Sequence, residues 1–448
     1  MGKNAATPLK DGFNSKIGFV LASVGSAVGM GNLWRFPLLI SAFGGMTFLI
    51  PYLIFVVLIG STGVIEEIAL GRSTQSGPIG ALGKAVAHLG KNGRIGELIG
   101  IIPVLGAMSL AIGYSCVIGW IVKYLVLAVN GSLYAMGGDM DTIGSTFGET
   151  ASSMGNNVWL IAGLVICFSI MAFGVARGIE KANKFMMPVL FTLLVFLAVY
   201  VAFQSGASEG YKYIFTVNTK GLADPKLWVF AFGQAFFSLS IAGNGTVIYG
   251  SYLGKNEDIP ASAANIAIFD TMASLLAAFL IIPAMATTGA QLDTGGPGLM
   301  FIHLVNVMNG MPAGRIISIV FYLCVFFAGM SSLINMFEAP VATLQQQFKL
   351  KRGIAVAIIA VTGTAVSLSI QGIVSGWMDV VSIYICPLGA MIAGVMFFWV
   401  FGKEYALDAV NESAKKKLGN KWFATGKYVY VIACAAVLIL GAIFGGIG

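Results

Sequence analysis

Long apolar stretches, separated by short polar connections, follow one another along the whole chain. Each stretch is long enough to cross a bilayer as a helix, which takes about 20 residues. The pattern predicts an all-α polytopic membrane protein with a single transmembrane domain over residues 1–448. Eleven spans are expected, near residues 17–40, 42–70, 98–129, 157–175, 185–204, 226–253, 259–288, 314–346, 353–371, 376–402 and 425–446.

The first span is interrupted at its centre by Gly25, Gly29 and Gly31, followed by Asn32 and Arg35. Glycine destabilises a helix by about 1 kcal/mol relative to alanine, so a break at membrane depth is expected. Freed carbonyl groups at a break can bind a cation, and the following half-helix can bind an anion at its N-terminus. Tight helix packing through small residues is the alternative. Arg35 counts against it, because a charge at that depth is costly and usually functional.

The sixth span is interrupted in the same way, by Ser238, Ser240, Gly243, Asn244 and Gly245. Interrupted spans at matching positions of two halves indicate an inverted repeat with a binding site near the membrane midplane. This prediction rests on position alone, because the halves show no evident sequence identity. The expected units are a first repeat at 17–204, a second at 226–402 and an extra last span at 425–446.

Charge is sparse and unevenly placed. The chain is 57% hydrophobic and 10% charged, with a mean hydropathy of +0.88, whereas soluble domains carry about 25% charged residues. The formal net charge of +7 comes from alternate loops, so it sets membrane orientation and does not indicate a nucleic-acid partner. The basic residues of these loops include Arg72, Lys84, Lys91, Arg94, Arg177, Lys181, Lys184, Lys349, Lys351, Arg352, Lys403, Lys415, Lys416, Lys417, Lys421 and Lys427.

The charge distribution predicts a cytoplasmic N-terminus, and an odd number of spans then places the C-terminus outside the cell membrane. The first sixteen residues are too polar for a signal peptide. The oligomeric state stays open.

Ionisable and oxygen-bearing side chains inside the spans are the next candidates for function. Span 7 carries Asp270, and span 8 carries Ser331, Ser332 and Glu338. A carboxylate in the membrane needs a partner, which can be a lysine, a proton or a metal ion. Oxygen ligands suit a hard cation. The five cysteines all lie in apolar segments with no disulfide or zinc spacing, and both histidines are expected outside the midplane. Further acidic residues are Glu66 and Glu67 in span 2 and Asp379 at the start of span 10.

Several motifs together resemble the neurotransmitter:sodium symporter family in its bacterial amino-acid branch, of the eleven-span type. The most specific is AVGMGNLWRFP at 27–37. It is followed in family order by GGMTFLIPY at 44–52, EEIALGR at 66–72, GIEKANKFMMP at 178–188, GQAFFSLS at 233–240 and FAGMSS at 327–332. The resemblance implies an inverted-repeat fold with spans 1 and 6 unwound, and sodium-coupled uptake of an amino acid.

The resemblance implies two sodium ions. The first would bind the Ala27 carbonyl, Asn32, Ser238, Asp270 and the substrate carboxylate, and the second the residues Gly25, Val28, Ala328, Ser331 and Ser332. An ion in contact with the substrate carboxylate couples the two affinities. The residues implied in substrate binding are Ala27, Gly29, Met30, Gly31, Tyr114, Phe237, Ser238, Ser240, Gly243, Ser332 and Met336.

Two glycines bear on the substrate. Monoamine carriers of the family have an aspartate at the position of Gly29, so glycine here leaves room for the α-carboxylate of an amino acid. Several relatives carry a bulky apolar residue at the position of Gly243, so the side-chain pocket is expected to be enlarged. Large apolar or aromatic amino acids are therefore the expected substrates.

The gates follow the family in part. Arg35 and Asp379 match its outer gate, and Lys10 stands where the inner gate usually has an arginine. The usual aspartate partner of that arginine falls near Gln346, so the inner gate cannot be carried over intact.

Asp270 is a second departure, because many relatives have asparagine there. The positions matching the family's chloride site are Tyr52, Gln234, Ser238 and Ser274. A fixed carboxylate beside them predicts chloride-independent transport, and suggests proton counter-transport once sodium has left.

Two other classes of protein compete with the symporter. A transport-like receptor or sensor would keep the binding residues and lack coupling, but no signalling domain or long tail is present. An intramembrane enzyme would need a metal cluster or an activated nucleophile. No HExxH motif occurs, and the GxSxG match at 206–210 (GASEG) lies in the connection after span 5, outside the apolar segments.

Overall fold

The computed structural model describes residues 12–241, 244–287, 289 and 297–444, and its described part is helical without a strand. Among the described residues, eight helices are long and apolar enough to cross a membrane, and a bent pair in the first span gives a ninth. The all-α membrane class predicted from the sequence is confirmed. The fourth and sixth expected spans are occupied by shorter helices, so the count of eleven stays a prediction.

The spans are assembled from α-helices and several π-turns. In chain order they consist of α1 (Lys16–Ala27), η1 (Gly31–Arg35) and α2 (Phe36–Phe43); α3 (Met46–Ile59), η2 (Gly60–Val64) and α4 (Ile65–Thr74); α7 (Ile101–Asn130); α10 (Asn157–Ala172); η3 (Val175–Glu180) and α11 (Lys181–Ala202); α13 (Pro225–Ser238) and α14 (Gly245–Ser251); α15 (Ile259–Thr287); α17 (Gly314–Phe348); α18 (Arg352–Ser369); α19 (Val374–Val380), η8 (Val381–Ile385), α20 (Cys386–Val395), η9 (Met396–Phe401) and α21 (Gly402–Asn411); and α22 (Asn420–Ala424), η10 (Thr425–Tyr430) and α23 (Val431–Phe444).

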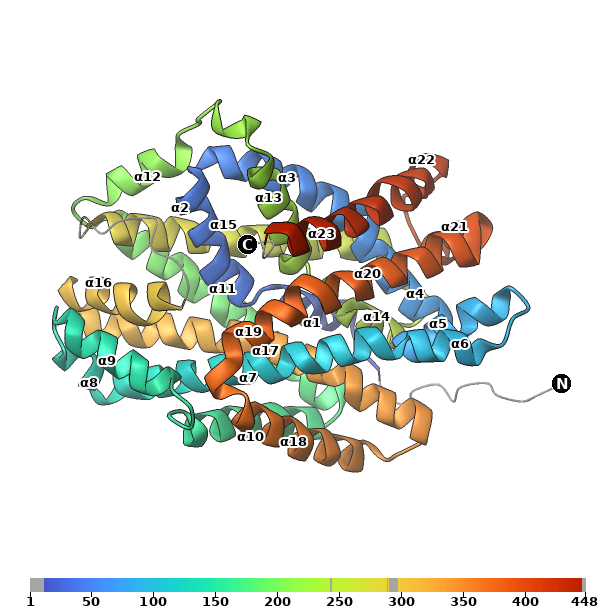
Figure 1. The fold of residues 1–448 in the computed structure, drawn as a ribbon, viewed down its shortest axis with the longest axis horizontal. Coiled ribbons are helices and arrows are strands. Elements are labelled where there is room, and N and C mark those ends of the chain that lie inside the picture. The colour runs from blue at the N-terminus through green and yellow to red at the C-terminus, as the bar shows by residue number, and fades with distance from the viewer. Residues whose placement is uncertain (1–11, 242–243, 288, 290–296, 445–448) are drawn as a thin grey trace.

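Short helices also occupy connecting segments for which the sequence pattern predicts no helix. Figure 1 shows α8, α9, α12 and α16 gathered at one end of the helix bundle and α5, α6 and α21 at the other. Their polar, short patterns lack the long apolar run on which the span prediction relied. These connecting helices are α5 (Pro78–His88), α6 (Gly93–Ile99), α8 (Ser132–Ala135), α9 (Met140–Ala151), α12 (Ala207–Phe215), η4 (Gly221–Ala223), η6 (Leu299–His303), α16 (Leu304–Gly310) and η7 (Gln371–Ile373).

The predicted interruptions of the first and sixth spans are confirmed. The two halves of the first span meet at 51°, and Val28 between them has an extended backbone with φ −74° and ψ 102°. In the sixth span α13 ends at Ser238 and α14 begins at Gly245. Ser240 and Asn244 between these half-helices have left-handed backbones, with φ values of 57° and 51°.

Intact helices enclose these interruptions on every side. The half-helix α1 packs against α11, α15 and α17, while the two halves of the sixth span pack against the second span, α13 on α3 and α14 on α4. The long helices α7 and α17 pack along one another. Non-helical backbone at membrane depth is therefore covered by protein and not exposed to lipid, as its hydrogen-bonding groups require.

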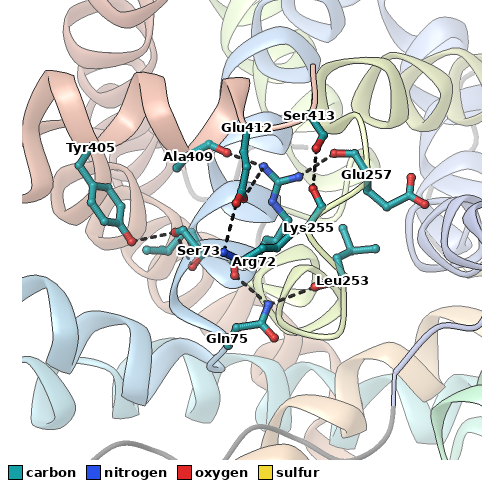
Figure 2. Close-up of polar contacts among 11 residues, drawn as sticks. Arg72, Ser73, Gln75, Leu253, Lys255, Glu257, Tyr405, Ala409, Glu412 and Ser413 are labelled. Carbon is teal, nitrogen blue, oxygen red and sulfur yellow. Dashed lines mark hydrogen bonds and ion pairs between the residues drawn. The ribbon is translucent and has the colours of Figure 1, made fainter. Parts of the chain in front are cut away.

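Arg72 joins three segments at the end of the second span (Figure 2). Its guanidinium donates to the carbonyl oxygens of Glu257 and Ala409, both at 2.6 Å, and lies 3.7 Å from the Glu412 carboxylate. Lys255 reaches the same carboxylate at 3.4 Å. The side chain thus ties the second span to the connection between α14 and α15 and to the end of α21, which extends beyond the predicted end of the tenth span at residue 402.

Candidate functional site

The interrupted backbone of the first span leaves carbonyl groups without helical partners. The Ser332 hydroxyl, on α17, lies 3.2 Å from the carbonyl oxygen of Gly25, 3.2 Å from that of Ser26 and 3.4 Å from that of Val28. Ser240, from the interruption of the sixth span, donates to the Ser26 carbonyl at 2.5 Å. Side chains from two other spans therefore replace the lost helical bonds, as buried carbonyl groups need.

The amide groups that begin the second half of the span are also satisfied by side chains. Asn32 Oδ1 accepts from the Gly29 amide at 2.9 Å, and the Tyr114 hydroxyl accepts from the Met30 amide at 2.9 Å. Tyr114 belongs to α7, so the break is held on the third span as well as on α17. Amide groups at the start of a helix favour an anion. The start of this second half is therefore the position expected for a substrate carboxylate.

A fully buried polar cluster lies directly behind this turn. The Asn32 Nδ2 group donates to Ser238 Oγ at 2.9 Å, Asp270 Oδ1 at 2.6 Å and Ser274 Oγ at 2.8 Å. Ser238 also donates to Asp270 Oδ2 at 2.8 Å. The sequence placed Asn32, Ser238 and Asp270 in one ion site, and the structure brings the three together from spans 1, 6 and 7. The oxygen atoms of Ser238, Ser274 and Asp270, which include one carboxylate, are a donor set that fits a hard monovalent cation, while Asn32 presents its Nδ2 group to them.

A second group of oxygen atoms lies between α1 and α17. Ser331 donates to the Ala328 carbonyl at 3.0 Å, next to the contacts of Ser332 with the first span. The sequence did not single out Asn183 of α11, which is buried here with its Oδ1 atom unpaired among the described residues. A Cβ atom on Gly25 would lie 2.2 Å from Asn183 Oδ1 and 2.9 Å from Ser331 Cβ, so glycine lets the three spans meet.

A small cavity of about 40 Å³ opens at the break between the first and sixth spans. Of the residues predicted to bind substrate, Ser238 belongs to the ion cluster instead, and Gly243 lies outside the described residues. Leu110 and Asn335 also line the cavity, and the sequence gave no signal for either. The predicted residues that line it are Ala27, Gly29, Met30, Gly31, Tyr114, Phe237, Ser240, Ser332 and Met336.

A wider vestibule of about 420 Å³ adjoins this cavity and shares Met30, Tyr114 and Phe237 with it. Both predicted outer-gate residues, Arg35 and Asp379, line the vestibule. The Arg35 guanidinium lies 5.3 Å from the centroid of the Phe237 ring, within range of a cation–π interaction. Both residues of the predicted gate therefore line the vestibule that adjoins the cavity.

Comparison with known proteins supports this picture across almost the whole chain. The sequence profile described as the sodium:neurotransmitter symporter family matches residues 10–136 and 142–445. The chain belongs to the sodium:neurotransmitter symporter family. It is therefore a sodium-dependent membrane transporter and not an enzyme.

Individual members of this family add detail. An uncharacterized sodium-dependent transporter of Methanocaldococcus jannaschii is 31% identical over 97% of this chain and 90% of its own. The mouse sodium-dependent neutral amino acid transporter B(0)AT3 is 26% identical over 93% of this chain and 82% of its own. The crystal structure of MhsT in complex with L-phenylalanine matches with a TM-score of 0.85 and 30% identity, over 96% of this chain and 99% of that one.

The structure also places an ion pair that the sequence did not predict. Glu338 of α17 accepts from both terminal nitrogens of Arg352 at 2.8 Å and from the Tyr252 hydroxyl at 2.6 Å. Glu338 was noted as a polar residue of span 8, but its partner lies fourteen positions further on, at the start of α18. The carboxylate is fully buried, and the paired guanidinium compensates its charge.

The predicted inner gate is described only in part. Lys10 lies outside the described residues. Gln346, at the position of the family's usual aspartate, accepts from the Gly77 amide at 2.9 Å through its Oε1 atom. It therefore contacts the start of α5.

We expect Gly29→Ala to weaken amino-acid binding at least tenfold, equivalent to about 1.4 kcal/mol. A Cβ atom there would lie 2.6 Å from Ser332 Oγ and 2.8 Å from the Tyr114 hydroxyl, which would displace two groups that hold the break. Gly144→Ala on α9 is the matched control, because a Cβ atom at that position meets nothing within 4 Å. Equilibrium binding of labelled phenylalanine would measure both variants, and unchanged affinity in Gly29→Ala would contradict the placement of the site.

Proposed function

We propose that this chain carries a neutral amino acid into the cell together with sodium, by alternating access between two inverted repeats at about 17–204 and 226–402. The cavity between the two broken spans is the single observation that carries the proposal. Large apolar or aromatic amino acids are the proposed substrates. Phenylalanine in MhsT supports this class, as does Gly243 in the sequence.

Two sodium ions are proposed to accompany the substrate. The first would be held by the Asn32, Ser238 and Asp270 cluster with the Ala27 carbonyl, and the second by oxygen atoms of Gly25, Val28, Ala328, Ser331 and Ser332. A sodium ion in the first of these sites would lie next to the Gly29 and Met30 amides, where the substrate carboxylate is expected. Binding of ion and substrate would then be favoured mutually, and each affinity would depend on the other by the same factor.

Chloride independence is proposed from Asp270. Its carboxylate supplies a fixed negative charge within the ion cluster, and Gln234, at the family's chloride position, donates its amide to the Gly31 carbonyl at 2.9 Å. A chloride ion a few ångströms away would be repelled in this buried setting. For the carrier without sodium and substrate we propose proton counter-transport: Asp270 takes up a proton after sodium has left, and the proton is carried outward on the return step.

The proposed orientation places the N-terminus and the basic connections in the cytoplasm of a cell whose plasma membrane holds the protein. The end of the bundle formed by α5, α6 and α21 is then cytoplasmic, and the end formed by α8, α9, α12 and α16 is outside (Figure 1). Arg35 and Asp379 would close over bound substrate from the outer side. A transport-like receptor is the alternative function, and it would bind without accumulating substrate.

We expect Asn32→Ala to weaken sodium and substrate binding together, because one side chain both caps the Gly29 amide and contacts Asp270. Asn156→Ala is the matched control. That buried asparagine donates to the Cys116 carbonyl and does not line the cavity, so its loss would lower stability and leave sodium dependence unchanged. Labelled phenylalanine, displaced by each of the twenty amino acids at several sodium concentrations, measures both properties. Substrate affinity that ignores sodium in the native protein would refute the coupling, and strongest displacement by glycine or alanine would refute the substrate class.

Replacing chloride by gluconate should leave uptake by the native protein unchanged. Asp270→Asn removes the fixed charge, so this variant should lose uptake in gluconate and recover at least part of it in chloride. Uptake in the two salts, measured at equal sodium, gives the comparison. A chloride requirement in the native protein would overturn the assignment of Asp270.

The outer gate is expected to work as a charge pair. Asp379→Asn should reduce uptake severalfold, because Arg35 would lose its closing partner. The exchanged variant Arg35→Asp/Asp379→Arg should recover part of the uptake that either single change removes. Normal uptake by Asp379→Asn would remove Asp379 from the gate.

A further inference from the structure

Two adjacent carboxyl groups on the second span, Glu66 and Glu67, are not used by the proposed sodium and substrate sites. Both side chains are fully buried. They differ sharply in their surroundings, because consecutive residues of a helix face different neighbours. Glu67 is hydrogen-bonded to the sixth span, whereas neither oxygen of Glu66 has a hydrogen-bond partner among the described residues. The pair therefore allows a comparison of two identical groups in one stretch of helix.

Glu67 is surrounded by hydrogen-bond donors. It accepts from the Thr246 hydroxyl, from Asn244 Nδ2 at 3.2 Å, and from the backbone amides of Thr246 and Val247 at the start of α14. These donors satisfy the oxygen atoms of the buried carboxyl group. Glu67 therefore caps the start of α14 and fixes the second half of the broken sixth span.

Glu66 has neither a hydrogen-bond partner nor an ion-pair partner among the described residues. The titratable groups that face it there are Glu67 on its own helix and Tyr430 and Cys434 on the last span. None of the three supplies a positive charge, and Glu67 would repel a second negative one. An isolated carboxylate in such a place is far more costly than the neutral acid, so the group takes up a proton instead.

The last span covers Glu66 closely. Trp422 donates from Nε1 to the Ser61 carbonyl at 2.7 Å, where the π-turn η2 interrupts the second span. A Cβ atom on Gly63 would lie 2.7 Å from the Tyr430 ring, and one on Gly394 would lie 3.2 Å from the same ring. Glycine on both neighbouring spans thus lets Tyr430 pack against the second and tenth spans and keep water from the carboxyl group.

We propose that Glu66 is a proton-binding site, and that the second span packs against the last span while this carboxyl group is protonated. In this packed arrangement the proton stays on a carboxyl oxygen. When the two spans separate and water reaches the group, the O–H bond breaks, the proton passes to water and a hydrated carboxylate remains. Closing the spans reverses this step with a proton taken from water. The pH thereby sets how readily the second span separates from the last span. Because Glu67 binds α14, the second half of the broken sixth span would move together with the second span.

The direct test is infrared spectroscopy of the full-length protein in lipid at neutral pH and saturating sodium. We expect a protonated-carboxyl C=O band that shifts in D₂O, is lost in Glu66→Gln and persists in the matched control Glu67→Gln. A band unchanged in Glu66→Gln would overturn the proposal, as would a band lost only in Glu67→Gln. Sodium-dependent phenylalanine binding by Glu66→Gln shows that the variant is folded, whereas absence of such binding in the native protein would count against the proposed function separately.

Thermal unfolding gives an independent readout with a defined sign. A carboxyl group that is protonated when packed and ionised when exposed binds more protons in the native state, so stability falls as pH rises above about 4.3. One such group changes the unfolding equilibrium up to tenfold per pH unit. Glu66→Gln should lose this part of the slope, and Glu66→Met, also uncharged, should lose it as well. An unchanged slope in both variants would show that Glu66 holds no proton.

Discussion

The missing helical hydrogen bonds of the first span, around Val28–Met30, are the constraint on which the rest of the centre depends. Backbone groups cannot stay unpaired at membrane depth, so side chains of several neighbouring spans provide substitutes. Ser332 on α17, Ser240 in the sixth span, Tyr114 on α7 and Asn32 on the same turn all bind this backbone. Three of these groups, Ser332, Ser240 and Tyr114, also line the cavity.

Buried charge is the second constraint, and the chain meets it differently at each place. Glu338 is paired with Arg352, while Glu67 is surrounded by hydroxyl and amide donors. Asp270 is bonded to Asn32 and Ser238, in a cluster of oxygen atoms suited to a cation. Because each carboxyl group has a different compensating partner, each can respond to a different event: a moving helix, an arriving ion or a proton.

Much of this arrangement could be predicted from the sequence, because glycine and polar residues inside long apolar runs mark a broken span directly. The breaks in spans 1 and 6 belong to that part, whereas the grouping of Asn32, Ser238 and Asp270 was implied by the family resemblance. The connecting helices were missed because they lack long apolar runs. The Glu338–Arg352 pair, the contact of Asn183 with Gly25 and the different neighbours of Glu66 and Glu67 depend on helix packing, which leaves no local pattern in the sequence.

The most direct test of sodium coupling is uptake of labelled phenylalanine by the purified protein in sealed vesicles. An inward sodium gradient should drive phenylalanine above its outside concentration, and equal sodium on both sides should allow equilibration only. Sodium-dependent binding without accumulation would contradict symport and favour a receptor. Accumulation that is independent of the sodium gradient would contradict the coupling itself.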